Sequence, residues 1–570
     1  MASELERKQR RKKVIAGSST ILLLLLVVGT VATTVYQADD KPDPNTRTMR
    51  STTKAVKMLC AGTDYKQTCE TSLTKFSNTT TSDPKELLKA AVVALIDEAS
   101  RSFSQSSVFK SNDSRVQDAI NDCWEMYYDS KEDLVKTLNR IIDTGLEHLP
   151  DQTLNLKNWL SAVHFYQETC VDGFPEGELK NKMRSAMKAT KELTSNALAM
   201  IGQVSDLLTM LGVPSWSRRL LSVEHRPVMK RGYPSWVSEG DRRLLKEHLN
   251  FKLKPNVTVA KDGSGDFGTI NEAIRNMPLK YSGRYVIYVK EGIYKEAVNL
   301  TSKYVNITMY GDGPKKTIVT GSKNFKDGTK TSHTATFVAS GEGFMAIDMG
   351  FHNTAGPEKE QAVALRVQSD RSIFINCRMA GYQDTLYAQS HFQFYRGCVI
   401  TGTIDFVFGD ASAVFQNCLF LLRRPLAKQR NIVTAHGRSY SHESTGFVIQ
   451  HCKIKADRSL KKAEEQKVEN YLARPWKAYS RTIFMENQIS SYIHPAGYLP
   501  WDGDFALKTL YYAEYNNNGE GSNVKARVKW PGFHVIDRKT AEKFTVANFI
   551  EGKRWIPSRG APAHMDLYYR

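Results

Sequence analysis

Residues 374–418 read FINCRMAGYQDTLYAQSHFQFYRGCVITGTIDFVFGDASAVFQNC, and the period of this stretch decides the fold. Its cysteines, Cys377, Cys398 and Cys418, fall 21 and 20 residues apart. An apolar or aromatic residue stands three or four places before each cysteine, and the pattern returns before Cys452. A period near 20 with short β-rich runs is typical of a parallel β-helix, in which each coil stacks on the last and buries the same position.

Short β-rich runs recur along the second half of the chain. They lie at 257–260, 285–289, 305–310 and 317–320, with few long helical patterns between them. We therefore predict an all-β domain over 246–570 built as a parallel β-helix. An antiparallel sandwich is the alternative, although hairpin signals such as Asn-Gly are scarce here.

Two aspartates repeat with the same period. Asp384 lies in GYQDTLY, and Asp405 lies 21 residues later in DFVFG. The two carboxylates are therefore expected on neighbouring coils, about 4.8 Å apart along the stack. Gln361 precedes Asp384 by 23 residues and falls one coil further along the same face. Two carboxylates this close have one raised pKa, which leaves one acid and one anion near neutral pH.

An anion beside an acid suits attack on an acyl carbon. The amides of Gln361 and Gln383 are candidate donors to an oxyanion, and Arg474 is placed to orient the ionised aspartate and to pair with an acidic substrate. Aromatic residues suited to a sugar-stacking rim are Trp476, Tyr387 and Phe408. On spacing alone the structural alternative stays open, in which the aspartates cap coil corners and the amides form a solenoid ladder.

Residues 55–211 have helical periodicity instead. Asp83 is a candidate N-cap, followed by Pro84 at the first helical position and by Glu86 in the capping-box place. His164 stands alone between apolar residues and is interpreted as a structural histidine. Further helical runs at around 115–128, 131–148, 153–171 and 178–211 predict an all-α four-helix bundle.

Residues 212–245 have the character of a linker, and they contain one phrase twice. Pro-Ser-Trp is followed by Arg-Arg-Leu-Leu, which ends first at Leu221 and then at Leu245. Dibasic pairs in an exposed, flexible chain are natural protease targets. We predict that a processing protease cuts at these sites and releases 246–570; chance basic pairs are the alternative.

The first residues indicate membrane targeting. Residues 1–13 hold a basic cluster, and 14–35 are 22 residues without a charge, which is long enough to span a bilayer. We predict a signal anchor over 14–36 with a cytoplasmic tail over 1–13, which gives a type II precursor in the secretory-pathway membrane. A cleavable signal peptide is the alternative.

Cysteines and sequons indicate an oxidising compartment. The eight cysteines form no CxxC pair, which favours disulfides over a zinc or redox site. They fall into two groups of four, one before residue 171 and one after residue 376. Their pairing stays open on sequence, because each group of four allows three connectivities. Five Asn-x-Ser/Thr sequons are candidate glycosylation sites, at Asn78, Asn112, Asn256, Asn299 and Asn306.

Charge points to a polyanionic partner. The net charge is +19, and residues 246–570 hold 45 basic and 30 acidic side chains, or +15. Nucleic acid is excluded, because no recognition motif is present and the chain is expected on the wrong side of the membrane. Residues 263–268, GSGDFG, match a dinucleotide fingerprint, but no βαβ unit follows.

Five segments closely resemble, in order and spacing, the signature segments of plant pectin methylesterases. These are GIYKE at 292–296, QAVALR at 361–366, GYQDTLY at 381–387, DFVFG at 405–409 and LARPW at 472–476. The part before the linker resembles the inhibitor-like pro-region of this family. The resemblance implies a right-handed parallel β-helix that hydrolyses methyl esters of polygalacturonate in the cell wall without cofactor or metal.

By the same resemblance, each site residue has an expected role. Asp405 would be the nucleophile that forms an acyl-enzyme, and Asp384 the general acid and then base. Gln361 and Gln383 would stabilise the oxyanion. The residues expected to bind methyl-esterified homogalacturonan are Arg474 and Trp476, with Tyr387 and Phe408 beside them.

The resemblance also implies disulfides and regulation. Expected pairs are Cys60–Cys69, Cys123–Cys170 and Cys418–Cys452, with Cys377 and Cys398 free. The pro-region is expected to inhibit the enzyme before processing, and the mature enzyme is expected to be a monomer in the cell wall.

Three residues depart from the pattern of the family. Ala473 replaces a usual Gly, Tyr498 a common Trp, and Asp410 the Asn that follows the nucleophile motif. An extra carboxylate next to that motif is expected to raise the pKa of Asp405.

Two other functions fit parts of the pattern. A glycosidase or lyase on the same solenoid would also use two carboxylates. In a non-enzymatic alternative the bundle inhibits other esterases while the solenoid only binds polysaccharide, although the intact Asp384, Asp405 and Arg474 set argues against it.

Overall fold

The computed structural model describes residues 54–76, 83–109, 111–206, 229–230, 233–234, 254–279, 281–461 and 468–569. The predicted signal anchor over 14–36, the tail over 1–13, the sequon at Asn78 and the cleavage positions Leu221 and Leu245 lie outside these residues. Within the described ranges, no helix is both long and apolar enough to cross a bilayer.

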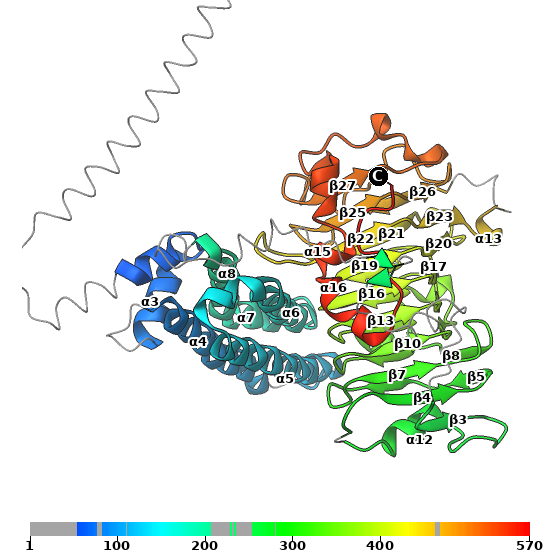
Figure 1. The fold of residues 1–570 in the computed structure, drawn as a ribbon, viewed down its shortest axis with the longest axis horizontal. Coiled ribbons are helices and arrows are strands. Elements are labelled where there is room, and N and C mark those ends of the chain that lie inside the picture. The colour runs from blue at the N-terminus through cyan, green and yellow to red at the C-terminus, as the bar shows by residue number, and fades with distance from the viewer. Residues whose placement is uncertain are drawn as a thin grey trace, which may run out of the picture.

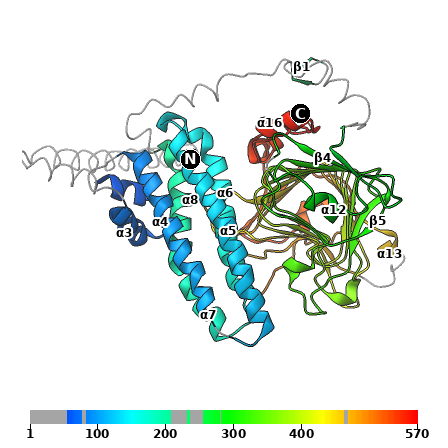
Figure 2. The same cartoon turned by 90° about the horizontal axis from the view of Figure 1, so that it is seen from below.

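The N-terminal part is a helical bundle that lies beside a β-helix (Figures 1 and 2). Its four long helices form a closed ring of contacts, from α4 to α5, α5 to α6, α6 to α8 and α8 back to α4. The helices are α3 (Lys66–Phe76), α4 (Pro84–Ser104), α5 (Ser114–Asp143), α6 (Thr153–Asp172), α7 (Glu178–Ala186) and α8 (Lys188–Gly202), with 3₁₀ turns η1 (Gln105–Val108) and η2 (Leu146–Gln152). The predicted four-helix bundle is confirmed.

Local signals set the helix starts. The Asp83 side chain accepts a hydrogen bond of 2.9 Å from the backbone N–H of Lys85, and Pro84 is the first helical residue, as expected. The two runs expected at 115–128 and 131–148 are one unbroken helix, α5, because no Gly or Pro separates them. Conversely, the run at 178–211 is divided into α7 and α8.

Two disulfides cross-link the bundle. Cys60–Cys69 closes a short segment before and within α3, and Cys123–Cys170 joins α5 to α6. Both pairings confirm the expectation from the resemblance. A small helical domain gains stability from such links, because they restrict the unfolded chain.

The β-helix consists of three sheets whose strands pair in parallel, so the predicted parallel β-helix is confirmed and the antiparallel sandwich is wrong. Sheet 1 contains β3 (Val257–Val259), β4 (Tyr285–Val289), β7 (Ile307–Tyr310), β10 (Met345–Ile347), β13 (Ser372–Ile375), β16 (Phe392–Arg396), β19 (Ser412–Gln416), β22 (Gly446–Gln450), β25 (Arg481–Met485), β27 (Tyr511–Tyr515) and β28 (Phe533–Val535). Sheet 2 contains β5 (Gly292–Lys295), β8 (Thr317–Gly321), β11 (Gly350–Asn353), β14 (Arg378–Ala380), β17 (Val399–Gly402), β20 (Leu419–Leu422), β23 (Lys453–Ala456) and β26 (Gln488–Ile489). Sheet 3 contains β6 (Val298–Leu300), β9 (Phe337–Ala339), β12 (Leu365–Val367), β15 (Leu386–Ala388), β18 (Val407–Gly409), β21 (Asn431–His436) and β24 (Asn470–Ala473).

Inside the β-helix, equivalent residues of successive coils stack on one another. The rings of Phe374, Tyr395 and Phe415 lie nearly parallel, with centroids 4.9 and 4.6 Å apart. Each stands three places before its cysteine. Phe394, four places before Cys398, lies instead on the outer face of sheet 1, because side chains alternate across a strand.

The four cysteines of the β-helix are free and buried, so the expected Cys418–Cys452 disulfide is wrong. The backbone N–H of Cys418 donates to Sγ of Cys452 over 3.2 Å. Both thiols also donate to carbonyls of a neighbouring coil, as Cys452 does to Phe415 over 3.3 Å. The main-chain ladder already aligns these residues, and the sulfurs serve as small interior groups. Cys377 and Cys398 are free, as expected.

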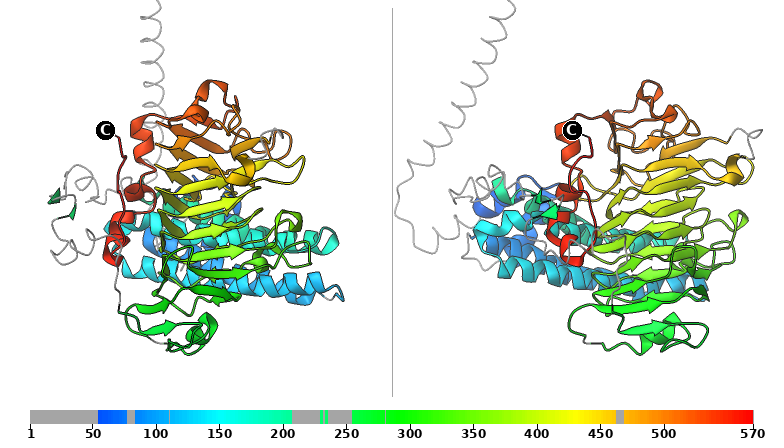
Figure 3. Two further views of the ribbon diagram at one scale, coloured as in Figure 1. Left: turned by 90° about the vertical axis from the view of Figure 1, so that its right-hand side faces the viewer. Right: turned by 45° about the vertical axis from the view of Figure 1, so that its right-hand side comes forward.

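Short helices close the ends and one side of the solenoid. Residues 263–268 join β3 to α12 (Ile270–Arg275), whose apolar residues cover the first coil. β4 then pairs in parallel with β3, so a βαβ connection does follow this segment, contrary to expectation, and it forms the first coil of the β-helix. At the other end α14 (Arg538–Glu542), α15 (Val546–Phe549) and α16 (Gly552–Trp555) run back along sheet 1 (Figure 3). The remaining elements are the strand pair β1 (Met229–Lys230) and β2 (Tyr233–Pro234), α13 (Arg458–Lys461), and the turns η3 (Thr331–Thr334), η4 (Pro357–Lys359), η5 (Glu520–Ser522), η6 (Val524–Ala526) and η7 (Pro557–Arg559).

The described sequon residues differ in exposure. Asn112, Asn256 and Asn299 are exposed, whereas Asn306 is half-buried. Glycosylation at these sites stays a prediction.

A buried ion pair holds the last coils together. Arg527 Nε lies 2.6 Å from Glu514 Oε1, and each side chain is 1% exposed. The hydroxyl of Tyr498 donates to the same carboxylate over 3.2 Å. The tyrosine at this position is therefore accommodated by a polar partner.

Replacing Arg527 should leave a buried carboxylate without its cation. We expect Arg527→Leu to lower the free energy of unfolding by about 3–5 kcal/mol, measured by urea-induced loss of strand circular dichroism. The control Arg538→Leu removes an exposed pair with Glu542 and should change it by less than about 1 kcal/mol. Equal stability of the two variants would contradict a role for the buried pair.

Candidate active site

Asp384 and Asp405 each lie two residues before one of two adjacent strands of sheet 3, β15 and β18. β15 and β18 pair in register at Leu386 with Val407, so the residues two places earlier also stand side by side. Both aspartates have left-handed backbone angles, with φ of +60° and +47°, which Asp tolerates better than most residues. Both are buried. The structure thus brings together the pair expected from the period of 21.

Arg474 follows β24 and holds Asp405. Its Nε lies 2.8 Å from Oδ1 and 3.1 Å from Oδ2 of Asp405, and its Nη2 also contacts Oδ2. The guanidinium stacks over the ring of Trp501, 4.3 Å from the ring centroid. This two-pronged contact fixes the carboxylate in position and favours its charged form.

The two carboxyl groups differ in their electrostatic surroundings. Burial, followed by the charge of Asp405, places the pKa of Asp384 well above its ordinary value. Burial also raises the pKa of Asp405, but the Arg474 guanidinium acts in the opposite direction. A protonated Asp384 beside an ionised Asp405 is the division of states that acid-assisted nucleophilic attack requires.

The backbone places two glutamines near this pair. Gln383 immediately precedes Asp384. The backbone carbonyl of Gln383 accepts a hydrogen bond of 3.2 Å from the backbone N–H of Ala362 on the previous coil. Gln361 precedes Ala362 and therefore lies next to this backbone contact. Its Oε1 is buried without a hydrogen-bond partner among the described residues.

The expected aromatic rim forms a floor next to the carboxyl groups. Tyr387 and Phe408 stack with their ring centroids 4.3 Å apart. The ring centroids of Trp476 and Phe408 are 6.0 Å apart. This aromatic floor is covered. The ring of Phe165, in α6 of the bundle, lies over it, with its centroid 6.5 Å from that of Tyr387 and 6.0 Å from that of Trp476.

The domain interface is polar around this aromatic contact, and sequence reasoning missed it. The bundle contributes six acidic residues to it, namely Asp64, Asp122, Asp129, Asp133, Glu168 and Asp172. Their partners on the β-helix include two lysines, Lys330 and Lys477, and Lys477 lies 2.8 Å from Asp172. The spacing of Asp122, Asp129 and Asp133 on one helix face was the available signal.

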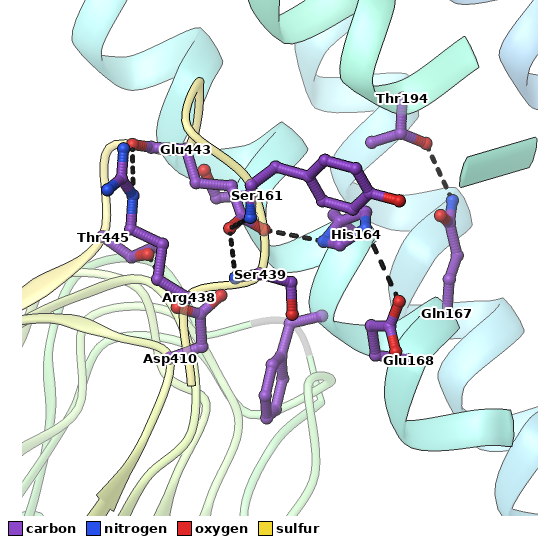
Figure 4. A network of polar contacts seen from close by, with 12 residues as sticks. Ser161, His164, Gln167, Glu168, Thr194, Asp410, Arg438, Ser439, Glu443 and Thr445 are labelled. Atoms are coloured by element: carbon purple, nitrogen blue, oxygen red, sulfur yellow. Dashed lines mark hydrogen bonds and ion pairs between the residues drawn. The ribbon is translucent and has the colours of Figure 1, made fainter. Parts of the chain in front are cut away.

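His164 of the bundle also contacts a carboxylate of the β-helix. Its Nδ1 lies 2.7 Å from Oε1 of Glu443, and both side chains are fully buried (Figure 4). Oε2 of Glu443 accepts from the backbone N–H groups of Ser439 and Tyr440, which holds the loop between β21 and β22. His164 is thus buried as a structural histidine would be, yet its partner belongs to the other domain.

The departures at Asp410 and Ala473 leave the carboxyl pair intact. Asp410 Oδ1 accepts from Thr445 over 2.6 Å, and burial and Glu443 raise the pKa of Asp410 well above its ordinary value. Burial and Arg474 are the causes that shift the pKa of Asp405, and the influence expected of Asp410 stays a prediction. Ala473 packs into the interior.

One group of side chains in the described ranges has the composition of a metal site. Asp122, Glu125 and His333 place one ligand atom each within 4.8 Å of the others. Lys330 Nζ, however, lies 2.9 Å from Asp122, and this ammonium group would compete with a bound cation.

Comparison with known proteins covers both parts of the chain. The pectinesterase family model matches residues 256–553, and the model for plant invertase/pectin methylesterase inhibitor matches 54–200. The chain is 49% identical over 518 residues to probable pectinesterase/pectinesterase inhibitor 13 of Arabidopsis thaliana, covering 90% of this chain and 82% of that one. It is also 49% identical to the putative pectinesterase/pectinesterase inhibitor 45 of the same plant, over 90% and 85% of the two chains.

A solved structure matches the β-helix alone. The pectin methylesterase from carrot is 47% identical, with a TM-score of 0.55. The match covers 99% of that chain and 55% of this one. The solved chain of that relative therefore corresponds to little more than half of this chain.

Removing the Arg474 cation should make Asp405 harder to ionise. We expect Arg474→Gln to raise the pKa of Asp405, so that its ionisation moves to higher pH in a titration followed by the carboxylate infrared band. Arg474→Lys keeps the charge and should shift the midpoint less. An unchanged midpoint in Arg474→Gln would show that burial alone governs this carboxyl group.

Proposed function

The chain belongs to the pectinesterase family and carries an inhibitor-like domain, and from this membership we propose an acyl-enzyme mechanism restrained by that domain. The observation that supports it best is the buried carboxyl pair, with Arg474 on Asp405, lying next to an aromatic floor that Phe165 covers. The substrate is methyl-esterified homogalacturonan.

The first half-reaction forms the acyl-enzyme. A carboxylate oxygen of Asp405 attacks the ester carbonyl carbon, and the amides of Gln361 and Gln383 donate to the oxyanion that develops. As the C–O bond to the methoxy group breaks, protonated Asp384 gives its proton to the leaving oxygen. Methanol departs, and the galacturonyl group remains joined to Asp405 as an anhydride.

The second half-reaction returns the enzyme to its starting state. Asp384, now a carboxylate, takes a proton from a water molecule as its oxygen attacks the acyl carbon. The bond to Asp405 breaks, and Arg474 stabilises the carboxylate that is released. The product is a free galacturonate carboxyl group. Two carboxylates would equally suit a glycosidase or lyase, but the family membership favours ester hydrolysis.

Autoinhibition follows from where the bundle docks. Phe165 lies in one apolar cluster with Val363, Tyr387 and Phe408, and this cluster is the floor beside the carboxyl pair. A sugar chain stacked on Tyr387 and Phe408 would occupy the space of the Phe165 ring. The bundle therefore competes with the substrate for the same floor.

The polar contacts around Phe165 hold the bundle in this position. The Nε1 of Trp159 and the Nδ2 of Asn158 donate to the Asp370 carboxylate, over 3.1 and 3.0 Å. His164 and Glu443 form the buried pair drawn in Figure 4. Buried polar groups of this kind are costly to separate, because each loses its partner.

Release of the bundle requires a cut in the linker. A protease acting at Leu221 or Leu245 frees the β-helix, which then works as a monomer in the cell wall. The alternative that the bundle inhibits other esterases and the β-helix only binds polysaccharide leaves the carboxyl pair without a role.

The nucleophile can be tested directly. We expect residues 246–570 to release methanol from highly methylated pectin, and Asp405→Ala to lower kcat by about 10³-fold or more. Asp410→Asn is the matched control. It changes the aspartate that directly follows β18, and it should retain most of the activity. Persistence of methanol release in Asp405→Ala would contradict the acyl-aspartate mechanism.

The inhibitory contact can be tested in the full chain. Truncating a central aromatic anchor weakens an interface by about 2 kcal/mol or more, so Phe165→Ala should raise methanol release several-fold towards that of residues 246–570. Tyr128→Ala removes an aromatic ring that is 64% exposed on the same bundle and should have no effect. If the unchanged full chain were as active as residues 246–570, autoinhibition would be ruled out.

A further inference from the structure

One arginine reaches from two coils away to the loop that carries Asp384. Arg423 directly follows β20, which pairs with β17, and β17 in turn pairs with β14. The backbone N–H of Arg423 donates to the carbonyl of Gly402 on the neighbouring coil over 2.9 Å, and its carbonyl accepts from the side chain of Asn431 over 2.9 Å. The main chain of Arg423 is therefore fixed independently of its side chain.

The guanidinium of Arg423 makes three contacts with two consecutive residues, Gly381 and Tyr382. Nη1 donates to the backbone carbonyl of Gly381 over 2.8 Å, and Nη2 donates to the hydroxyl of Tyr382 over 2.9 Å. The guanidinium carbon also lies 3.8 Å from the centroid of the Tyr382 ring. A planar fork that donates twice and stacks once fixes both the position and the tilt of its partner, which the point charge of a lysine does not do.

Small residues on the intervening coil leave room for this contact. Gly402 stands in register with Leu422, the residue before Arg423, and Thr403 follows it. The backbone N–H of Thr403 donates to the carbonyl of Tyr382 over 2.9 Å. A Cβ at position 402 would lie 2.6 Å from that carbonyl oxygen, so glycine is required for the close approach.

Asp457 also faces the guanidinium, at a greater distance. Its Oδ2 lies 3.8 Å from Nε of Arg423. Oδ1 of the same carboxylate accepts from the backbone N–H of Leu460 over 3.0 Å, at the start of α13. An ion pair this long and partly exposed contributes little. The main partners of Arg423 are therefore in the loop before β15.

The two residues that Arg423 holds are continuous with the candidate catalytic residues. Gln383 and Asp384 come next in the chain, and Asp384 has a left-handed φ of +60°. Among the described residues, the charges that act on the Asp384 carboxyl are those of Asp405 and Arg474. Arg423 therefore acts on this loop through the position of the backbone and not through its charge.

We propose that Arg423 is a positioning residue that holds the loop 381–384 so that Gln383 and Asp384 face the ester. The proposal rests on the proposed function, because it gives a support to the oxyanion donor and the acid assigned there. Without the fork, the loop loses its tie to the coil of β20, and the acid moves away from the leaving oxygen and towards water. A displacement of about 1 Å can lower a rate by about a hundredfold.

The test uses the full chain and compares Arg423→Gln with Arg430→Gln. Arg430 lies in the same connection between β20 and β21, and its Nε lies 2.7 Å from Oε2 of Glu469 at an exposed position. We expect Arg423→Gln to lower kcat for methanol release by about 10- to 100-fold, with KM within about twofold of the unchanged chain. Arg430→Gln should match the unchanged chain in both constants.

A second measurement needs no turnover. The C=O stretch of the protonated Asp384 carboxyl is followed by infrared titration of the full chain, with Asp384→Asn to assign the band. Burial is the largest cause of the raised pKa of Asp384, so a loop that opens to water in Arg423→Gln should move the midpoint to lower pH. Loss of a cation that acted through space would move the midpoint to higher pH, which separates position from charge.

Tyr382→Phe tests the same contact with a smaller change, which keeps the proposal testable even if Arg423→Gln does not fold. It keeps the ring and removes the hydroxyl that Nη2 contacts, so kcat should fall by about two- to fivefold. The double variant Arg423→Gln/Tyr382→Phe should have the kcat of Arg423→Gln alone, because the hydroxyl acts through the fork.

Three results would overturn the proposal. They are a kcat of Arg423→Gln equal to that of Arg430→Gln, a shift of the Asp384 midpoint to higher pH, and a double variant whose loss is the product of the two single losses. A lack of methanol release from every form of the chain would overturn the proposed function instead, while the infrared midpoint would still test the role of Arg423.

Discussion

Stacking of one coil upon the next at strand spacing is the constraint on which the rest of the structure depends. It gives each residue the surroundings of its register partner on the next coil, which lies 21 places away between β15 and β18, so Asp384 and Asp405 share one buried position just before these adjacent strands. Two carboxyl groups that are buried together cannot both stay ionised at low cost. Arg474, delivered by β24, binds Asp405 directly but acts on Asp384 through its charge alone, which favours an acid at Asp384 and an anion at Asp405.

The same stacking leaves the outer face of sheet 3 as a continuous surface, and this surface receives the bundle. Its aromatic part meets Phe165, and its cationic part meets the acids of α5 and α6. Charges buried at an interface are tolerated only where each one is paired. The acidic side chains of the bundle are paired in this way with groups on the β-helix, as Asp172 is with Lys477.

The two domains are stabilised in different ways. The bundle is small and is cross-linked by Cys60–Cys69 and Cys123–Cys170, whereas the cysteines of the β-helix stay reduced. In the solenoid the backbone ladder and the stacked rings, such as Phe374 on Tyr395, already fix neighbouring coils. Thiols at such positions act as small apolar side chains that fill the interior.

The sequence by itself determined the β-helix, the four-helix bundle and the carboxyl pair, because each is encoded by a short repeat. A period of 21 requires that Asp384 and Asp405 stack, and Asp83 followed by Pro84 starts a helix wherever the chain goes next. Only the tertiary structure decided the partners of His164, Phe165 and Asp122, because those partners belong to the other domain and lie hundreds of residues away in the sequence. The same is true of the Cys418 and Cys452 thiols, whose state depends on main-chain contacts between coils. No local pattern records which surfaces meet, because docking depends on the shape and charge of two folded domains at once.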